Sequence, residues 1–388
     1  MPEHIYDAAI IGGGPAGSTA AIFLAGLGFD VCLFEKKPFP REVLCGEFLS
    51  HEVFSIIREI GLEDEFIAAR PNRINHFRLF DDSGINLNGD LNFTAYGLKR
   101  GTFDMMLLKE ANEMGVTILQ PAVVEAITLL DDYNSSYSIQ FSSGNNTKTI
   151  KARKVIAAYG RQNILDKKLN RSFTNRKSQL NGVKFHVDEQ FFKSFNKNEI
   201  HIYTSDAIYC GVNAVNNGFM TVCFLEKRKN PQQTPRGQIL KLIENNKAFA
   251  DLFNDDFVNE IDNMPIYGTG NIYFGKRNLI ENGIYMTGDA GHVIAPLAGD
   301  GISMAMQSGR LAALIITDVL HGSISSGSAH KLYIDKWGDS FFKRIYTAKA
   351  IQNMLLNKRA RKIGLSFIKL YPRMLGYFIE LTRGKYKD

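Results

Sequence analysis

The alternation of apolar and polar positions divides the chain into three regions of different character. In the first region, an apolar run over residues 5–11 passes through glycines directly into a helical pattern that begins near residue 15. A second apolar run follows at residues 31–34. Strands that alternate with helices in this way are typical of a parallel sheet. The first region therefore predicts an α/β dinucleotide-binding fold.

The segments that follow continue the alternation of helix and strand. Ser50 is a candidate N-cap for a helix that begins at His51, and residues 98–104 open another helix. A short strand is expected at residues 116–119, and residues 123–157 are expected to form hairpin strands. These elements extend the first domain well beyond its opening strands.

The pattern changes between about residue 180 and residue 270, where alternating, aromatic-rich strands are joined by Asn/Gly turns. This period of two indicates an antiparallel sheet, which would form a wall of a substrate cavity. A strand that starts at Ile284 and ends on Gly288-Asp289, and a helix from Ile302, then return the chain to the first domain. We predict a discontinuous dinucleotide-binding domain, an inserted sheet domain and a C-terminal helical segment. Their boundaries are 1–75, 98–178 and 275–328 for the first, 76–97 and 179–274 for the second, and 329–388 for the third.

The C-terminal segment carries the positive charge of the protein. From Lys331 to Asp388 the chain has 14 Lys+Arg and 4 Asp+Glu, a net charge of +10, whereas the other residues have 32 and 36, a net charge of −4. Apolar and basic positions are interleaved in two helical patterns over residues 338–371, and Pro372 is expected to break the run. Such helices suit an anionic membrane surface. The alternative is that they pack across the sheet domain with their lysines in solvent.

Composition limits the other possibilities. An apolar content of 45% and a charged content of 22% are those of a globular protein. The four cysteines form no CxxC motif and no disulfide framework, which indicates a reducing cytosol. The first strand begins almost at the N-terminus, so we expect no signal peptide, and no apolar run reaches the length of a membrane span. We therefore predict a cytoplasmic protein with possible peripheral membrane contact and no nucleic-acid partner.

The glycines after the first strand carry the strongest chemical signal. Gly12, Gly14 and Gly17 have the G-x-G-x-x-G spacing, which permits a tight turn, approach of a pyrophosphate to the backbone, and close packing of helix on strand. The helix that follows presents free N–H groups to the phosphates. Glu35 ends the second strand, where a carboxylate accepts hydrogen bonds from an adenosine ribose. This combination predicts a bound dinucleotide.

A second glycine-rich turn lies in the returning segment. The strand that starts at Ile284 ends on Gly288-Asp289, and Gly299-Asp300-Gly301 precedes a long helical pattern. The N-terminus of that helix is free to face a ligand. Reduced flavin, which carries negative charge at one edge of its ring, needs a partner of this kind.

These motifs, in this order, resemble FAD-dependent oxidoreductases of the aromatic-hydroxylase and geranylgeranyl-reductase superfamily over roughly residues 5–320. Cys45-Gly46-Glu47 and Gly299-Asp300-Gly301-Ile302 are similar to motifs of the reductase branch, whereas His292 is similar to a hydroxylase position. The resemblance implies a Rossmann-like FAD-binding domain with an inserted antiparallel β-sheet substrate domain. The FAD contacts that we expect are Gly12, Gly14, Pro15, Ala16, Gly17, Glu35, Lys36, Arg41, Cys45, Gly46, Arg100, Val124, Gly288, Asp289, Pro296, Gly299, Gly301 and Ile302.

The resemblance implies an enzyme that uses reduced flavin on an apolar or aromatic metabolite. We expect a monooxygenase-type reaction; the alternative is reduction of isoprenoid or lipid double bonds, and a remote one is a non-catalytic binder similar to the GDP-dissociation inhibitors. Candidate catalytic residues are Cys45, Glu47 and His292. His186 and Tyr209 are candidate substrate contacts, although both positions also suit a protein core. No cluster of His, Cys and carboxylate residues has the spacing of a metal site.

Three motifs depart from those of the superfamily. One is the Tyr-x-Trp-x-Phe-Pro motif of geranylgeranyl reductases, which reads Tyr209-Cys210-Gly211-Val212-Asn213 here. The middle motif, usually Ala-Asp-Gly, is Ala158-Tyr159-Gly160 here, so the acid associated with both FAD and the nicotinamide partner is missing. NAD(P)H remains the expected reductant. We expect direct reduction of the protein by NAD(P)H to be slow without substrate, or to depend on another electron donor. The Trp-x-Trp-x-Ile-Pro motif of flavin halogenases is also absent, because the only tryptophan is Trp337.

Overall fold

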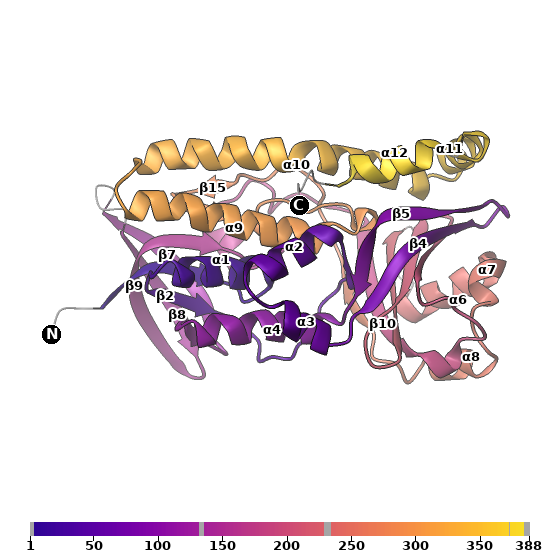
Figure 1. The fold of residues 1–388 in the computed structure, drawn as a ribbon, viewed down its shortest axis with the longest axis horizontal. Coiled ribbons are helices and arrows are strands. Elements are labelled where there is room, and N and C mark those ends of the chain that lie inside the picture. The colour runs from indigo at the N-terminus through magenta and orange to yellow at the C-terminus, as the bar shows by residue number, and fades with distance from the viewer. Residues whose placement is uncertain (1–3, 132–135, 229–233, 372, 384–388) are drawn as a thin grey trace.

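Two eight-stranded sheets organise the computed structural model, which describes residues 4–131, 136–228, 234–371 and 373–383. Figure 1 shows the first sheet and its helices at one end of an elongated molecule, and the second sheet at the other. One long C-terminal helix, α10 (Ser326–Leu356), runs along both parts. The predicted fold class is confirmed.

The first sheet has the strand order β15-β16-β9-β1-β2-β6, and the pairs from β16 to β6 are parallel. Alternate residues of its central strands point to opposite faces. Ala8 and Ile10 face helices α1 (Pro15–Gly26), α4 (Arg100–Glu113), α9 (Gly301–Leu320) and α10. Ala9 and Ile11 face the β7–β8–β9 hairpin strands. The strands are β1 (Ile5–Ile11), β2 (Val31–Phe34), β6 (Thr117–Leu119), β7 (Val123–Asp131), β8 (Ser136–Ser143), β9 (Asn146–Ala157), β15 (Ile280–Glu281) and β16 (Ile284–Met286).

The second sheet draws on three separate segments and has the order β14-β10-β13-β12-β11-β4-β5-β3. It is antiparallel except for β4 and β11, which pair in parallel. The sequence pattern could not predict this pair, because the two strands lie more than a hundred residues apart. The strands are β3 (Phe48–Leu49), β4 (Asn72–Asp81), β5 (Asn86–Gly97), β10 (Leu180–Asp188), β11 (Glu199–Ser205), β12 (Ile208–Ala214), β13 (Phe219–Lys227) and β14 (Tyr267–Thr269).

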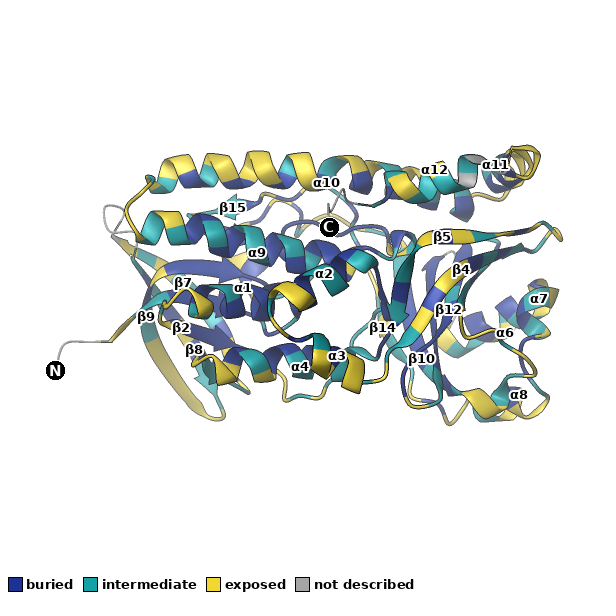
Figure 2. Ribbon diagram, in the orientation of Figure 1, coloured by how far each residue is buried: buried dark blue, intermediate teal, exposed yellow. Residues whose placement is uncertain are grey.

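Helices cover the second sheet on both sides. Small helices α6, α7 and α8 pack on one face around Phe185, Val222 and Phe249, and the C-terminal helices lie over the other face (Figure 2). The main helices are α1 (Pro15–Gly26), α2 (His51–Glu59), α4 (Arg100–Glu113), α9 (Gly301–Leu320), α10, α11 (Lys358–Leu370) and α12 (Arg373–Leu381). The shorter ones are α3 (Glu63–Ala68), α5 (Ile164–Lys168), α6 (Pro235–Asn245), α7 (Lys247–Ala250), α8 (Asp256–Glu260), η1 (Glu189–Phe191), η2 (Gly288–Ala290) and η3 (Pro296–Ala298).

The C-terminal helices differ from the prediction at one end. Helix α10 begins at Ser326, well before the predicted start at residue 338, because Ser325 caps it by accepting a hydrogen bond from the Ser328 N–H. Pro372, the predicted helix breaker, lies outside the described residues. Within the described ranges, no helix combines the length and the apolar character that crossing a bilayer requires.

Candidate functional site

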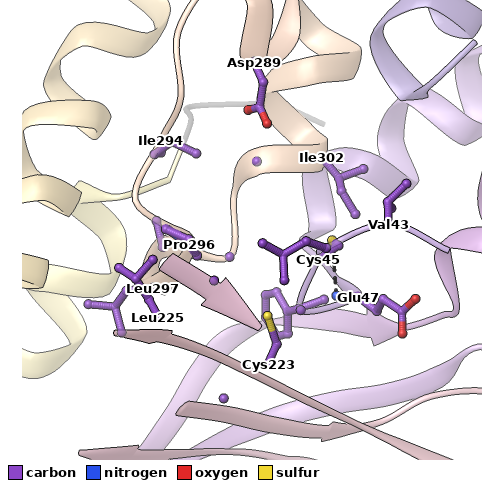
Figure 3. Close-up of a pocket in the computed structure, with 18 of the residues that line it drawn as sticks. Val43, Cys45, Glu47, Cys223, Leu225, Asp289, Ile294, Pro296, Leu297 and Ile302 are labelled. Carbon is purple, nitrogen blue, oxygen red and sulfur yellow. Dashed lines mark hydrogen bonds between the residues drawn. The ribbon is translucent and has the colours of Figure 1, made fainter. Parts of the chain in front are cut away.

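A cavity of about 1100 Å³ lies between the two sheets and is bordered by the C-terminal helices. Its walls include every predicted FAD contact except Gly17, together with Glu47 and Tyr209. Figure 3 shows part of this wall, including Cys45, Ile302 and Pro296. The structure therefore brings together motifs that lie almost three hundred residues apart.

The glycines of the first loop have two different roles: Gly12 and Gly17 allow close backbone packing, and Gly14 leaves space beside the helix N-terminus. Gly12 has a φ of +113°, and a Cβ on Gly17 would lie 1.9 Å from the carbonyl oxygen of Gly12, so both positions are packed against backbone. Gly14 has an ordinary φ of −78° and stands at the N-cap of α1. A Cβ there would meet nothing closer than the ends of Arg41 and Arg100, at 3.6 and 4.0 Å. Gly14 thus leaves a space lined by a helix N-terminus and two guanidinium groups.

The two arginines are held in place by acidic partners. Arg100 donates two hydrogen bonds to Asp104, at 2.7 and 2.8 Å, and Arg41 lies 3.4 Å from Glu35. Guanidinium groups fixed in this way beside a helix N-terminus form a binding site for phosphate groups. This arrangement fits the diphosphate of a dinucleotide.

Glu35 lies next to this space and has a fixed orientation. Its carboxylate accepts hydrogen bonds from the N–H groups of Gly13 and Lys37, each at 3.0 Å, and it is almost fully buried. A carboxylate fixed beside the glycine loop is placed to accept the hydroxyls of a ribose. Lys36 and Val124 line the same end of the cavity.

The second glycine-rich region, around Gly288 and Gly299, lines another part of the cavity. Gly288 has a φ of +55°, and its N–H donates to Ser308 on α9 at 2.8 Å. Asp289, beside it, has a side chain that is 38% exposed and lies 3.9 Å from Arg161. Gly299 has a φ of +60°, and a Cβ there would lie 2.8 Å from the Phe48 ring. These contacts hold the start of α9 open toward the cavity, as a flavin ring requires.

Glu47 has the most densely bonded side chain of the site. One carboxylate oxygen accepts from the Arg100 N–H at 2.8 Å and from Lys184 at 2.6 Å. The other oxygen lies 2.6 Å from His186 Nε2 and accepts from Thr221 at 2.5 Å. Burial opposes ionisation, but His186 and Lys184 outweigh it and lower the pKa of Glu47 to about 2.

These bonds change the role expected for Glu47. A carboxylate that stays ionised and accepts four hydrogen bonds is unsuited to donate a proton at neutral pH, so the contacts describe an anchor for the loop that carries Cys45. Glu42, Glu47 and His186 also lie close enough together to hold a metal ion. The Lys184 ammonium, however, is 2.6 Å from both Glu42 and Glu47, and it already neutralises their charge.

The two candidate histidines do not reach the cavity. His186 is held by Glu47, and His292 packs against Trp337 with ring centroids 6.1 Å apart; neither is among the described residues that line the cavity. Burial lowers the pKa of His292 to about 4. The predicted catalytic role of His292 and the predicted substrate contact of His186 therefore lack the geometry that they need.

Cys45 and Tyr209 do line the cavity. Cys45 is half-buried, and its Sγ accepts a hydrogen bond from the Glu47 N–H at 3.3 Å. Tyr209 is almost fully buried, with its hydroxyl facing the backbone of Leu297. A second thiol, Cys223, also lines the cavity, and burial raises its pKa to about 12. Of the candidate catalytic and substrate residues, Cys45, Glu47 and Tyr209 thus line the cavity.

An apolar chamber extends the cavity away from the glycine loops and was not predicted residue by residue. One wall is the second sheet and the other is the C-terminal helices. The signal was present in the alternation of β4, β5 and β11 and in the helical spacing of the last segment. The residues lining this chamber include Phe77, Leu79, Leu87, Leu91, Ile200, Ile202, Ile351, Met354, Leu355, Leu365, Phe367, Ile368, Phe378 and Ile379.

The donors and openings described above fit FAD. Gly14 opens beside two arginines, Glu35 is placed for the ribose, and Asp289 and the start of α9 are placed for the flavin half. Fold and site together define the class of the protein, which is a flavoprotein with a Rossmann-like domain and a second sheet domain.

Comparison with known proteins gives the family. The chain belongs to the FAD-binding-domain family, which it matches over residues 5–333. Its relatives include digeranylgeranylglycerophospholipid reductase of Methanoculleus marisnigri, 27% identical, with 98% of this chain and 96% of that protein covered. They also include 1H-pyrrole-2-carbonyl-[peptidyl-carrier protein] chlorinase of Pseudomonas fluorescens, 24% identical, with 86% and 80% covered. The predicted superfamily is confirmed, and the relatives support an FAD-dependent oxidoreductase-like enzyme.

Solved structures show the same fold. The myxobacterial chondrochloren halogenase CndH matches with a TM-score of 0.78 and 19% identity, over 96% of this chain and 90% of that one. PqsL of P. aeruginosa, in complex with 2-aminobenzoylacetate, matches with a TM-score of 0.74 and 15% identity, over 92% and 98%. Both matches include the second sheet domain as well as the first.

Proposed function

We propose that the protein is a monooxygenase-type FAD-dependent enzyme acting on an apolar or aromatic molecule with an elongated apolar part. One observation carries the proposal: a single cavity joins the dinucleotide-binding loops to an apolar chamber between the second sheet and the C-terminal helices. A chamber of this shape takes a long apolar group and excludes water from the reacting end.

The residues of the chain would bind FAD, orient the substrate and shield the reacting atoms from water. Gly14, Arg41 and Arg100 would hold the diphosphate, Glu35 the ribose and Asp289 the flavin half. Reduced FAD supplies the chemistry, because it can pass an oxygen atom from O₂ to an electron-rich ring or a hydride to a double bond. Glu47 would keep the Cys45 loop against the flavin. Tyr209 would contribute its ring to the cavity wall, because its hydroxyl is buried against the backbone of Leu297.

The fate of the predicted proton donors favours oxygenation over reduction. Reduction of a double bond requires a proton for the second carbon. Two of the three predicted catalytic residues are not placed to supply it, because Glu47 is held as a carboxylate and His292 does not line the cavity, which leaves Cys45. Hydroxylation of an aromatic ring releases a proton from the ring itself, so it needs no protein acid at carbon.

Double-bond reduction is the second candidate, favoured by the full-length match to a digeranylgeranylglycerophospholipid reductase, which includes the C-terminal helices. Halogenation is not proposed, because the tryptophan motif of flavin halogenases is absent. A non-catalytic binder similar to the GDP-dissociation inhibitors would need an eroded flavin half, whereas Asp289 and the Gly299 turn are in place.

Product analysis under labelled oxygen gas tests the proposal. The FAD-loaded protein, with a reductant that can be NADPH or a separate flavin reductase, is given a series of alkylphenols and a prenyl alkene. Incorporation of one labelled oxygen supports the proposal. Oxygen-independent gain of two hydrogens by the alkene overturns it in favour of reduction. Ile202→Trp narrows the chamber, so this variant should prefer alkylphenols with shorter alkyl chains than the wild type does. Ile67→Trp, at an exposed position of α3, is the matched control and should keep the wild-type substrate preference.

A further inference from the structure

Helix α11 has two apolar faces. Leu365 and Ile368 are buried on the face that closes the chamber. On the opposite face, Ile363, Phe367, Leu370 and Tyr371 follow the spacing of one helical stripe. Their exposed fractions are 72%, 47%, 74% and 57%. Large apolar side chains gathered on one exposed stripe are unusual on a protein surface and mark a contact surface.

The exposed stripe is bordered by basic residues. Lys358, Arg359, Lys362 and Lys369 are exposed on the same helix, and the sequence from 358 to 371 contains no Asp or Glu. A helix with an exposed apolar stripe and only positive charge is complementary to an anionic surface that has an apolar interior.

Helix α11 is firmly held, so the stripe is not a frayed end. Asn357 caps it by accepting from the N–H groups of Arg359 and Ala360, each at 3.1 Å. Arg361, buried on its inner side, pairs with Asp81 and Asp82 at the end of β4. The second sheet therefore fixes which face of α11 points outward.

The stripe also meets the rim of the chamber. Phe367 is half-exposed and at the same time lines the chamber, together with Phe378 and Ile379 from α12. Tyr377, on α12, is 56% exposed. Figure 2 shows α11 at the end of the molecule opposite α1, so a contact there leaves the dinucleotide domain free.

We infer that α11 and α12 dock on an anionic bilayer surface, with the α11 stripe in the boundary between headgroups and acyl chains and the chamber rim facing the lipid. An apolar substrate can then enter from the bilayer without crossing water. This inference goes beyond the proposed reaction, because docking does not depend on what the flavin does.

Vesicle flotation tests the inference with the full-length, FAD-loaded protein. The protein should float with phosphatidylcholine–phosphatidylglycerol vesicles at low salt, be released by high salt, and stay unbound with phosphatidylcholine alone. Ile363→Ser with Leu370→Ser should weaken binding more than about tenfold. Lys362→Gln with Lys369→Gln should weaken it about 25-fold, since each basic residue near such a surface contributes about fivefold.

Two matched variants control for apolar content and charge. Ile67→Ser with Val258→Ser removes exposed apolar side chains from α3 and α8, and Lys336→Gln with Lys343→Gln removes two exposed charges from α10. Both controls should float like the wild type.

The inference is overturned if the intact protein does not bind anionic vesicles at low salt, or if the control variants lose as much binding as the α11 variants. It is also overturned if the Ile363/Leu370 pair instead converts a dimer to a monomer in size-exclusion chromatography. The ratio of flavin to protein absorbance reports separately on the FAD site.

Discussion

Replacing Glu47 with Gln is the sharpest test of the loop that carries Cys45. The substitution keeps the shape of the side chain and removes its charge beside Lys184 and His186. A pKa of about 2, against an ordinary value of 4.5, means that the fold stabilises the ionised carboxylate by about 3 kcal/mol. We therefore expect Glu47→Gln to lower the free energy of unfolding by about 3 kcal/mol at pH 7.

The stabilisation by Glu47 should depend on pH in a defined direction. Since the folded pKa lies below the ordinary one, the contribution is complete above pH 4.5 and is lost as the pH falls toward 2. The difference between wild type and Glu47→Gln in urea unfolding should therefore shrink to about 1 kcal/mol at pH 3. Flavin occupancy of the variant should fall as well, because Glu47 holds the loop.

Glu42→Gln is the matched control. Glu42 bonds the same lysine at 2.6 Å, but its side chain is 28% exposed, so we expect a loss of at most about 1 kcal/mol. Equal effects of the two substitutions, or a Glu47→Gln effect that does not change with pH, would refute the assignment of Glu47 as a buried anchor.

Three further predictions concern the cofactor. Gly14→Ala should leave the free energy of unfolding in urea within about 1 kcal/mol of wild type, yet weaken FAD binding more than about tenfold. Gly17→Ala should disrupt the fold, because the added Cβ would lie 1.9 Å from the backbone of Gly12. Wild-type FAD affinity in Gly14→Ala, by absorbance titration, would contradict the diphosphate position. Asp289→Ala should lower the flavin-to-protein absorbance ratio without loss of stability, since the side chain is 38% exposed. NADPH should reduce the substrate-free protein slowly in anaerobic stopped-flow, because Tyr159 replaces the usual acid and its hydroxyl already donates to Asp166 at 2.7 Å; fast, saturable reduction would disprove this.

The parts of the site that sequence predicted are those built from local chain geometry. The glycine loops depend on tight turns that are determined by residues adjacent in the sequence. Separate roles for Gly12, Gly14 and Gly17 can therefore be predicted from the sequence alone. The role of Glu47 could not, because its partners Lys184 and Thr221 come from strands more than a hundred residues away. A carboxylate beside a cysteine suggests proton transfer until its hydrogen-bond partners are known. The same limit applies to His186, whose role was decided by its bond to Glu47.

The C-terminal segment has features that fit both hypotheses for a basic amphipathic tail. Packing on the sheet domain and contact with a membrane exclude each other only for a helix that has a single apolar face. Helix α11 has two, so the buried face can close the chamber while the exposed face remains available.

The connection between this segment and the flavin end is the 31-residue helix α10. Arg344, on α10, pairs at 3.0 Å with Asp300, the buried acid immediately before α9. Nearer the start of α10, Tyr333 donates to the carbonyl of Met286, just before Gly288, at 2.8 Å. Burial raises the pKa of Asp300 to about 6, while the neighbouring Arg344 and Arg383 act in the opposite direction and favour the ionised carboxylate. One continuous helix thus fixes both glycine-containing turns and ends beside α11, so the reacting end of the cavity and its apolar rim are positioned by the same element.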